Sequence, residues 1–519
     1  MANIYINPDW TGVESGTIEE PFSTFPTPSS NNNYYLKSGT TLNLDSIITF
    51  SALTNILIDK YDGEDKPIIT DIATSTDAGD WTNTSGDIWD FSSATYPLSL
   101  QGLNNLGDRN NPSWVHRVNY YGGATGSGTF TEFGQWDSDA TRFTIYSDVN
   151  PVTKWGTIYY NQVYYLRIRN GTTNMTIQNI RFKNMSSTVR IPGSTGNTDN
   201  IIIQHCEFEH SMRGPQCLPQ SGTILSNIKI RYNKFYRIGV VGINNGTSVT
   251  LYGSGNEIHD NEIYDTGYVE GVGGIYGQFG TNSSNVLMKI YNNIVDNVIE
   301  GIYWSSEARC LYFEHDSANV RAFKNTLSRA GTNQAGLHIN GGASNVKCYG
   351  NLIYNCDRGF GNSDAFPTGT DEFEICNNTF LNCDIGARYV RGAITDMATT
   401  LKNNVFYNAS GGTVVLRIDG DVNGHSGSID IDYNLYDGYD TLYENIDGTF
   451  TLTVGENNID GAYIEQNGYP LIDSDSVDTG TKWWTGPNPS GYNGEPFSDF
   501  DTDIGANQST YSPFHPKNL

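Results

Sequence analysis

The chain has 519 residues, of which 57 are acidic and 30 basic, so its formal net charge is −27 at pH 7. This acidic balance disfavours nucleic acid and anionic membrane surfaces as partners, because phosphate binding requires clustered Lys and Arg. The 56 Gly and 33 Tyr residues, with abundant Asn, are typical of many short strands and turns and predict an all-β protein with almost no α-helix.

The N-terminus begins directly with a strand-like pattern at residues 4–7, and no signal peptide is visible. No stretch approaches the roughly 20 apolar residues that span a bilayer, so membrane insertion is not expected. Seven Cys, an odd number in a large chain, predict reduced thiols rather than a disulfide framework. These features favour a virion or extracellular location, reached either by release with a virion or by secretion with a signal that has been removed.

Residues 1–170 are expected to form an N-terminal cap and the first irregular coils of a repetitive fold. A cap is needed because the first coil of a solenoid otherwise exposes an apolar edge and unpaired strands. Trp81, Trp89 and the Gly- and Thr-rich stretch 122–128 are assigned to a long excursion from the coils.

Residues 171–440 carry a repeated motif, aliphatic-x-x-Asn-x-aliphatic or aromatic, which is clear around Asn233 between Ile230 and Phe235. The other centres, two of which have another residue in the Asn position, are Ile180, Cys206, Asn261, Asn293, Asn325, Asn351, Asn378, Asn404 and Asn434. Successive centres lie 26 to 32 residues apart. The pattern predicts one coil of a right-handed parallel β-helix per repeat, with the Asn side chains hydrogen-bonded in a ladder along the interior.

A second column follows each centre and pairs a Gly with an apolar residue. Its members are Gly242-Ile243, Gly274-Ile275, Gly301-Ile302, Gly336-Leu337, Gly359-Phe360 and Gly386-Ala387. Cys356 and Cys383 also fall in one column, each five residues after its Asn. Coil spacing is slightly long for a disulfide, so an interior column of thiols is expected there, with a disulfide as the alternative.

Both ends of the chain extend the pattern. Residues 4–8, 16–24 and 35–41 are similar to the entry segment, and residues 470–473 and 503–506 to the closing segment, of the pectate-lyase-like superfamily of single-stranded right-handed parallel β-helix proteins. The resemblance covers nearly the whole length. Residues 441–519 lose the repeat and carry Trp483, Trp484, Pro487 and Pro489, which predicts a C-terminal cap. The resemblance does not select a chemistry, because the superfamily includes polysaccharide lyases, glycoside hydrolases, epimerases, phage tailspikes and adhesins.

The two longest spacings bracket Asn293, which places additional loops near residues 267–280 and 305–320 beside one face of the β-helix. The outward position after the Gly column is occupied in successive coils by Asn244, Tyr276, Tyr303, His338, Gly361 and Arg388. Tyr rings stack on sugars and their hydroxyls form hydrogen bonds. The expected substrate-binding residues are therefore Asn244, Tyr276, Tyr303, Trp304 and Arg388. The competing interpretation is that the row is rich in Tyr for strand propensity alone.

Two mechanisms of glycan cleavage fit these residues. In a lyase acting on a uronic acid, His338, Arg388 and a Tyr supply the base and neutralise the carboxylate. A hydrolase requires two carboxyl groups across the scissile bond, for which Glu270 and Glu307 are the leading pair. The reserve acids are Asp265, Glu314, Asp316 and Asp364. The competing interpretation of each acid is a solvated turn residue. The Lys and Arg signatures and paired-Asp calcium motifs of the best-known lyases of the superfamily are absent.

No CxxC pair or His-rich tract has metal-ligand spacing, so no metal site or cofactor is expected. The cluster at residues 314–316 includes His315, but neighbouring residues of a strand point to opposite faces. The acidic run at residues 499–503 fits either a structural Ca²⁺ site or the closing segment of the resembled superfamily.

The leading functional hypothesis is a protein that binds and cleaves an extracellular or cell-surface polysaccharide, as a phage tailspike or virion-associated depolymerase. Such a protein is compatible with a homotrimer, although no particle-binding head or trimerising tail is evident. The first alternative is a secreted bacterial polysaccharide lyase or glycoside hydrolase. The second is a glycan-binding adhesin or structural virion protein without enzymatic activity.

Overall fold

The computed structural model describes most of the chain up to residue 460. The described residues are 1–92, 100–102, 136–138, 142–155, 158–161, 164–192, 196–219, 224–246, 253–267, 272–279, 287–299, 308–314, 317–332, 334–363, 370–390, 396–419, 426–432, 434–445, 451–454 and 458–460.

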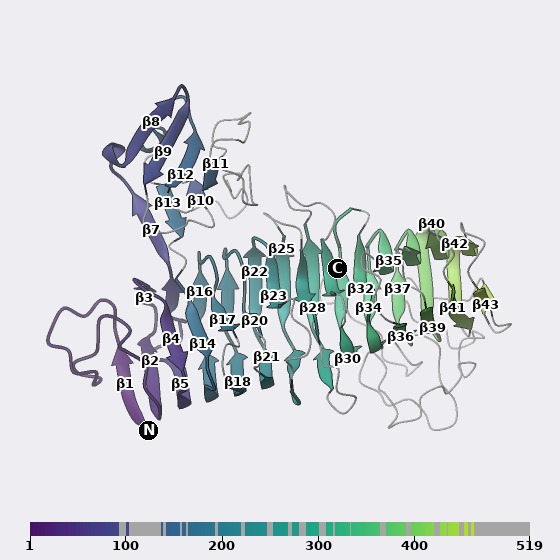
Figure 1. Cartoon of the computed structure of the whole chain (residues 1–519), viewed down its shortest axis with the longest axis horizontal. Coiled ribbons are helices and arrows are strands. Elements are labelled where there is room, and N and C mark those ends of the chain that lie inside the picture. Colours follow the sequence, from purple (N-terminus) through teal and green to yellow (C-terminus); the bar gives the residue numbers. More distant parts are fainter. Residues whose placement is uncertain are drawn as a thin grey trace.

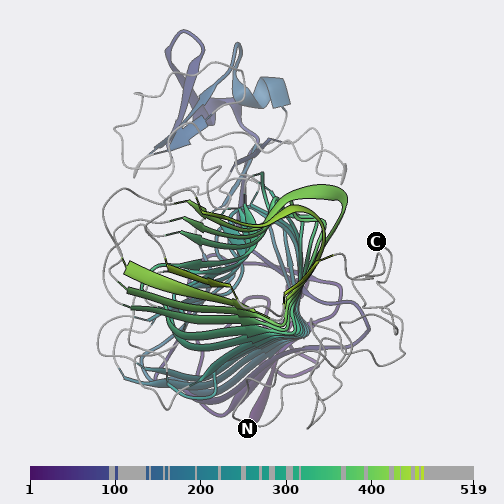
Figure 2. The ribbon, with the colours of Figure 1, turned by 90° about the vertical axis from the view of Figure 1, so that its right-hand side faces the viewer.

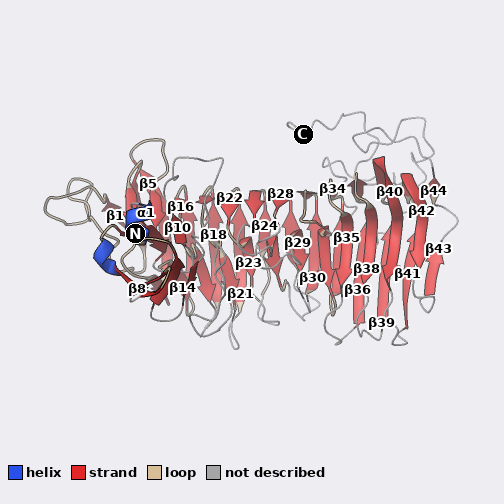
Figure 3. Cartoon of the chain, turned by 90° about the horizontal axis from the view of Figure 1, so that it is seen from above, coloured by secondary structure: helices blue, strands red, loops and turns tan. Residues whose placement is uncertain are grey.

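Most of the described strands are short and parallel, and they stack into one elongated solenoid (Figure 1). Three ladders of strands surround a common interior when the molecule is viewed along its long axis (Figure 2). The predicted all-β coil architecture is therefore confirmed, and the ladders continue across residues 170 and 441. Among the described residues the helices are α1 (Pro151–Trp155) and the 3-10 helix η1 (Ala78–Asp80), and neither is long and apolar enough to cross a membrane (Figure 3).

The first ladder runs the length of the solenoid and has 14 strands. In spatial order they are β1 (Ala2–Ile6), β2 (Asn32–Lys37), β5 (Thr54–Tyr61), β15 (Thr173–Gln178), β18 (Thr198–Gln204), β21 (Leu225–Arg231), β24 (Glu257–His259), β27 (Met288–Tyr291), β30 (Ala318–Phe323), β33 (Ser344–Tyr349), β36 (Thr370–Cys376), β39 (Asp396–Lys402), β41 (Ser426–Asp432) and β43 (Thr451–Val454).

The second ladder follows the Asn centres. Its strands are β3 (Thr41–Asn43), β6 (Ile68–Thr70), β16 (Arg181–Lys183), β19 (Glu207–Glu209), β22 (Lys234–Ile238), β25 (Glu262–Thr266), β28 (Ile294–Val298), β31 (Thr326–Ser328), β34 (Leu352–Tyr354), β37 (Thr379–Leu381), the first part of β40 (Val405–Asp419), the first part of β42 (Leu435–Asn445) and β44 (Ile459–Asp460).

The third ladder contains the Gly column. Its strands are β4 (Ile48–Ser51), β14 (Leu166–Arg169), β17 (Val189–Pro192), β20 (Gln216–Leu218), β23 (Val241–Asn245), β26 (Gly273–Gly277), β29 (Arg309–Phe313), β32 (Ala335–Asn340), β35 (Arg358–Ser363), β38 (Ile385–Val390) and the later parts of β40 and β42.

Between β6 and β14 the chain leaves the solenoid and forms an antiparallel unit that projects near its N-terminal end (Figure 1). Its strands are β7 (Ile72–Ser75), β8 (Trp81–Ser85), β9 (Ile88–Ser92), β10 (Leu100–Gly102), β11 (Trp136–Ser138), β12 (Arg142–Tyr146) and β13 (Ile158–Asn161). Trp81 packs on Phe91, and the indole of Trp89 donates to the carbonyl of Ser147 at 3.0 Å. The predicted excursion around Trp81 and Trp89 is confirmed, whereas residues 122–128 lie outside the described residues.

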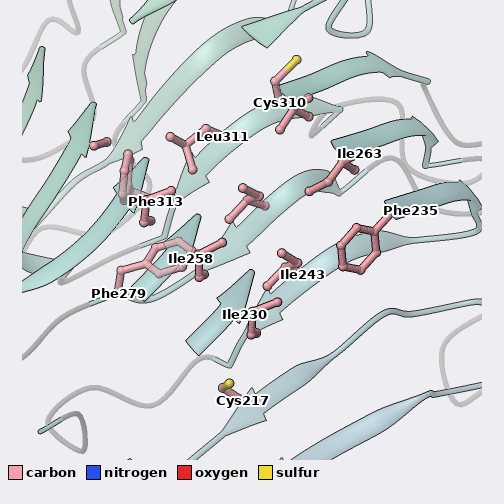
Figure 4. Close-up of a cluster of buried hydrophobic side chains, with 14 of the residues drawn as sticks. Cys217, Ile230, Phe235, Ile243, Ile258, Ile263, Phe279, Cys310, Leu311 and Phe313 are labelled. Carbon is pink, nitrogen blue, oxygen red and sulfur yellow. The ribbon is translucent and has the colours of Figure 1, made fainter. Parts of the chain in front are cut away.

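The interior of the solenoid is filled by aliphatic and aromatic side chains that repeat from coil to coil (Figure 4). The rings of Phe182, Phe208 and Phe235 stack with centroid separations of 5.1 and 4.6 Å. All seven cysteines are buried and free, as expected from their odd number. Cys310 joins Cys356 and Cys383 in a column of contacting thiols.

The Asn ladder is present as predicted. Asn261 donates from Nδ2 to Oδ1 of Asn293 at 2.9 Å, and Asn293 donates in the same way to Asn325 at 2.9 Å. Each Oδ1 also accepts the backbone N–H of the preceding Asn, which satisfies polar groups that are otherwise costly to bury. The ladder extends one coil beyond the prediction, from Asn434 to Asn458.

Asn also stabilises the corners of the coils. The residue before the ladder position has a positive φ in several coils, for example 54° at Asn292 and 58° at Asn377. Asn adopts this left-handed region more readily than most residues. The abundance of Asn therefore has two structural causes, interior ladders and tight corners.

The Gly column lies in the third ladder, where backbone and core side chains approach closely. A Cβ at Gly386 would lie 2.5 Å from Cδ1 of Phe406, so no larger residue fits without a shift. One predicted member is wrong, because Ile275 pairs with Leu311 and not with Ile302. The connection between β28 and β29 is longer than a fixed count from Asn293 assumes, so the column in that coil is Cys310-Leu311.

Candidate functional site

One outward-facing side chain per coil lies in register along the third ladder, and we call this line the outer row. Its members are Arg167, Arg190, Gln216, Asn244, Tyr276, Tyr312, His338, Gly361, Arg388, Arg417 and Glu444. Strand alternation sets the direction, because the flanking residues Leu337 and Ile339 of His338 belong to the core. Every member except Gly361 is polar or aromatic, so the row offers hydrogen bonds and rings along the axis.

The centre of the outer row is buried although it faces away from the core. Tyr312 is 1% exposed and His338 is 3% exposed. The amide of Asn340 donates to the Tyr312 hydroxyl at 2.6 Å, and Asn340 Oδ1 lies 3.3 Å from Nε2 of His338. The Tyr312 and His338 rings meet edge to face with centroids 5.2 Å apart. Tyr312, His338 and Asn340 thus form one packed, hydrogen-bonded group.

His338 is held in its neutral form. Burial lowers its pKa well below the usual value, and the positive charges of Arg309 and Arg358 lower it further. The hydrogen bond with Asn340 opposes this shift. A neutral imidazole at pH 7 is able to accept a proton, which is the role required of a general base.

Arginines surround this group. The guanidinium of Arg309 lies over the Tyr312 ring at 4.2 Å from its centroid. Arg388 and Arg417 both form ion pairs with Asp419, the latter with its Nε 2.7 Å from Oδ1. Arg358 lies beside them on the neighbouring strand.

The predicted binding residues are placed as follows. Asn244, Tyr276 and Arg388 all lie in the outer row, as expected, with Asn244 and Tyr276 in neighbouring coils and Arg388 four coils beyond Tyr276. Tyr303 and Trp304 lie outside the described residues, and the place assigned to Tyr303 in the row is taken by Tyr312, because Tyr276 pairs with Tyr312. The cause is the long connection between β28 and β29, which also displaced Gly301-Ile302 from the Gly column.

The predicted catalytic residues also lie partly within and partly outside the described residues. His338 lies at the centre of the row. Glu270, Glu307, His315, Asp316 and Asp364 lie outside the described residues. Glu314 follows β29 and is buried, whereas Asp265 lies at the end of β25 and accepts a hydrogen bond from Asn297.

Tyr312, Asn340, Arg358 and Asp419 were not predicted as site residues from the sequence. Tyr312 was hidden by the insertion before β29. Asn340 had a usable signal, because it lies two residues after His338 in the same strand and therefore on the same face. Arg358 and Asp419 come from other coils, and their approach depends on the stacking register.

A second aromatic line on the first ladder has a different character. The rings of His259, Tyr291, Phe323 and Tyr349 stack in parallel with centroids 4.6, 4.9 and 5.2 Å apart. Each internal ring face is covered by its neighbour, so these faces are not available to a sugar. In the outer row, by contrast, Tyr276 and Tyr312 are inclined by 58°.

Among the described residues, no group of three or more His, Cys, Asp or Glu side chains is arranged to hold a metal ion. The acidic run at residues 499–503 lies outside the described residues. The prediction of a site without a metal or cofactor therefore stays a prediction.

Comparisons with known proteins agree with this architecture. Residues 157–353 match the family model described as the right handed beta helix region. The chain is a right-handed parallel β-helix. This β-helix is similar to the structure of XylC in complex with xylose, with a TM-score of 0.58 at 12% identity, covering 97% of this chain and 94% of that one.

Two further structures show weaker similarity to the β-helix. They are the GH136 lacto-N-biosidase from Eubacterium ramulus, at 12% identity and a TM-score of 0.42 with 88% and 67% of the chains covered, and the pectate lyase Pel9A, at 11% identity and a TM-score of 0.31 with 98% and 96% covered. No curated protein sequence matches the chain significantly. The family model and the XylC structure support the fold alone, and function must be argued from the site.

Proposed function

We propose that the β-helix binds a polysaccharide along the outer row and cleaves it near His338. The observation that carries this proposal is the register of the row, in which consecutive coils place Asn244, Tyr276, Tyr312 and His338 on one face. Coils repeat at the strand spacing of about 4.8 Å. A row of regularly spaced polar and aromatic groups suits an extended polymer of sugar rings, each of which needs a stacking surface and hydrogen bonds.

The roles follow from exposure and charge. Tyr276 and Asn244 are partly exposed and supply a ring and an amide for binding. His338, neutral and fixed by Asn340, accepts a proton from the substrate or from a water molecule. We assign the accompanying carboxyl group to Glu314, which is buried directly after β29.

A panel of neutral and acidic polysaccharides tests the proposal. New ultraviolet absorbance indicates elimination, new reducing ends without absorbance indicate hydrolysis, and retention without either indicates an adhesin. We expect cleavage, with Tyr276→Ala weakening binding by about tenfold, equivalent to about 1.4 kcal/mol. Tyr236→Ala is the matched control, because Tyr236 lies in the second ladder outside the row. The proposal fails if no polysaccharide is bound or cleaved.

The biological setting belongs to the same proposal. Action as a phage tailspike or virion-associated depolymerase, a virion or extracellular location and a homotrimeric state all stay predictions. Purified virions probed with an antibody against the chain test the location, and light scattering of the purified protein tests the trimer.

A further inference from the structure

The outward face of the second ladder changes character along the solenoid. Its outward position, one residue after each ladder Asn, is charged in earlier coils, where Lys234 and Glu262 occupy it. Strand alternation sets this direction, because the residues that follow, Phe235 and Ile263, belong to the core. In the C-terminal coils the same position is uncharged and mostly aliphatic, and we call this part the apolar row. Its members are Leu352, Thr379, Val405 and Leu435.

The apolar row is buried although it points away from the core. Leu352 is 2% exposed, and Val405 and Leu435 are both 0% exposed. Ile294, by contrast, is 37% exposed at the same position two coils before Leu352. Both positions have ladder neighbours on each side, so the stacking of the coils does not explain the difference. A covering layer must therefore lie over the apolar row and end before Ile294.

Cys376 shows that the cover extends round the neighbouring corner. It ends β36 in register with Tyr349 of the outer aromatic line, and its neighbour Ile375 belongs to the core, so its thiol points outward. Cys376 is nevertheless 0% exposed, and it is the one cysteine of the seven that lies outside the interior core. The corner residue that follows, Asn377, is also buried, whereas Asn292 at the equivalent corner of an earlier coil is exposed.

The described part of the chain does not supply this cover. Its strands β34, β37, β40 and β42 pack on neighbouring strands of the solenoid, and no described strand or helix forms a second layer on their outer face. The antiparallel unit projects near the opposite end of the solenoid (Figure 1). In these coils the connections at 364–369, 391–395, 420–425 and 446–450 lead from the third ladder to the first, so they begin and end away from the second ladder.

We propose that residues 461–519 of the same chain fold back along the side of the solenoid and cover the apolar row. They follow β44, which is the rung of the second ladder next to Leu435. The four steps from β44 back to Leu352 span about 19 Å, which about six extended residues cross. The segment supplies large apolar side chains, and its tether keeps it at a high effective concentration beside the row. These side chains include Trp483, Trp484, Phe497, Phe500 and Phe514.

This role differs from that of an end cap, because the cover lies along the side of the coils and leaves the outer row of the third ladder open. It is independent of the proposed function. The thiol of Cys376 reports the cover in the full-length protein, where alkylation by iodoacetamide is followed by peptide mass spectrometry. We expect Val405→Asp to accelerate alkylation of Cys376 by about tenfold or more, because a charge beneath an apolar layer is costly. The six core cysteines should stay protected, which shows that the solenoid is folded.

Ile294→Asp is the matched control, because it places the same charge at an exposed position of the same ladder, and it should leave alkylation of Cys376 within about twofold of the wild type. Leu435→Asp serves if Val405→Asp does not fold. Rapid alkylation of Cys376 in the wild type, or an unchanged rate in the Asp variants of the apolar row, overturns the proposal. A wild-type rate that rises on dilution also overturns it, because the cover is then a second copy.

The identity of the cover is tested by placing a protease site after Asp460 in the full-length protein and cleaving it in the folded state. We expect the fragment 461–519 to stay bound to the cleaved wild type and to the Ile294→Asp control in gel filtration, and to leave the Val405→Asp variant. Release from the wild type with new reactivity of Cys376 also supports the proposal. Release with Cys376 still protected, or equal retention by all three proteins, contradicts it.

Discussion

The side-chain amide of Asn340 donates to the hydroxyl of Tyr312 at 2.6 Å across two neighbouring coils of the β-helix. The same amide group contacts His338 through its oxygen, so one side chain fixes both a ring and an imidazole. Both contacts are buried, which strengthens them and makes their loss costly.

Replacing Asn340 with Leu should alter the pH dependence of cleavage. The hydrogen bond from Nε2 of His338 to Oδ1 of Asn340 raises the pKa of His338, so its removal lowers that pKa further. If the neutral imidazole is the base, the acidic limb of the pH–rate profile moves to lower pH while the maximal rate falls about tenfold or more, in the range of general-base effects. An unchanged acidic limb with a reduced rate would indicate that Asn340 acts only through packing.

Gly361 is required for the position of His338. A Cβ at Gly361 would lie 2.8 Å from Nδ1 of His338 and 2.9 Å from Cβ of Ala335. We expect Gly361→Ala to displace the imidazole, reduce cleavage strongly and destabilise the fold by about 1–3 kcal/mol, as overpacking does. In the His338→Ala background the same substitution should cost less, and a double-mutant cycle of thermal unfolding measures the difference. Equal losses of stability in both backgrounds would indicate that the added methyl group clashes with a residue other than His338.

Acidification should destabilise the protein through His338. Its folded-state pKa is lowered below the unfolded value of about 6.5, so the unfolded chain takes up the proton first as the pH falls. The contribution of neutral His338 is complete above about pH 6.5 and is lost as the pH falls from there through the folded-state pKa. The difference in melting temperature between the wild type and His338→Gln should therefore be smaller at pH 5 than at pH 7. A difference independent of pH would contradict this assignment.

The Asn ladder should be essential for stability at each coil. Asn293→Ala leaves the carbonyl of Ile258 and the N–H of Asn261 without their partners, and each unsatisfied buried group costs about 1–3 kcal/mol. We expect a clear fall in melting temperature by calorimetry. Asn292→Gly is the control, because Asn292 is exposed and its φ of 54° suits Gly. A similar fall in melting temperature for the two variants would show that the buried Asn ladder contributes no more to stability than the exposed corner residue.

The repeat could be predicted from the sequence because its causes are local. A coil requires an apolar residue three positions before each Asn, and this spacing holds from Ile230 and Asn233 to Ile431 and Asn434. Asn458 was missed because its preceding aliphatic residue, Val454, is four positions away. The coils could therefore be predicted wherever the spacing between the apolar residue and the Asn was constant.

The site was predictable only in part, because its geometry depends on loop length and on the contacts between coils. His338, Tyr276 and Arg388 were found by counting from the Gly column. Tyr312 was lost where the connection before β29 breaks the count. The capture of Arg388 by Asp419, 31 residues later, depends on the stacking of β38 on β40 and leaves no local pattern.

The Asn ladder makes the alignment of the coils independent of the length of the segments that connect them. Each rung joins one coil to the next through the same atoms, whether successive Asn residues are 24 positions apart, as at Asn458, or 32, as at Asn325. Segment length is therefore free to change without disturbing the alignment of the outer row. Natural variation or design can accordingly exchange the connecting segments of this β-helix to alter what it recognises. The Asn ladder, which sets the spacing of the outer row, stays unchanged.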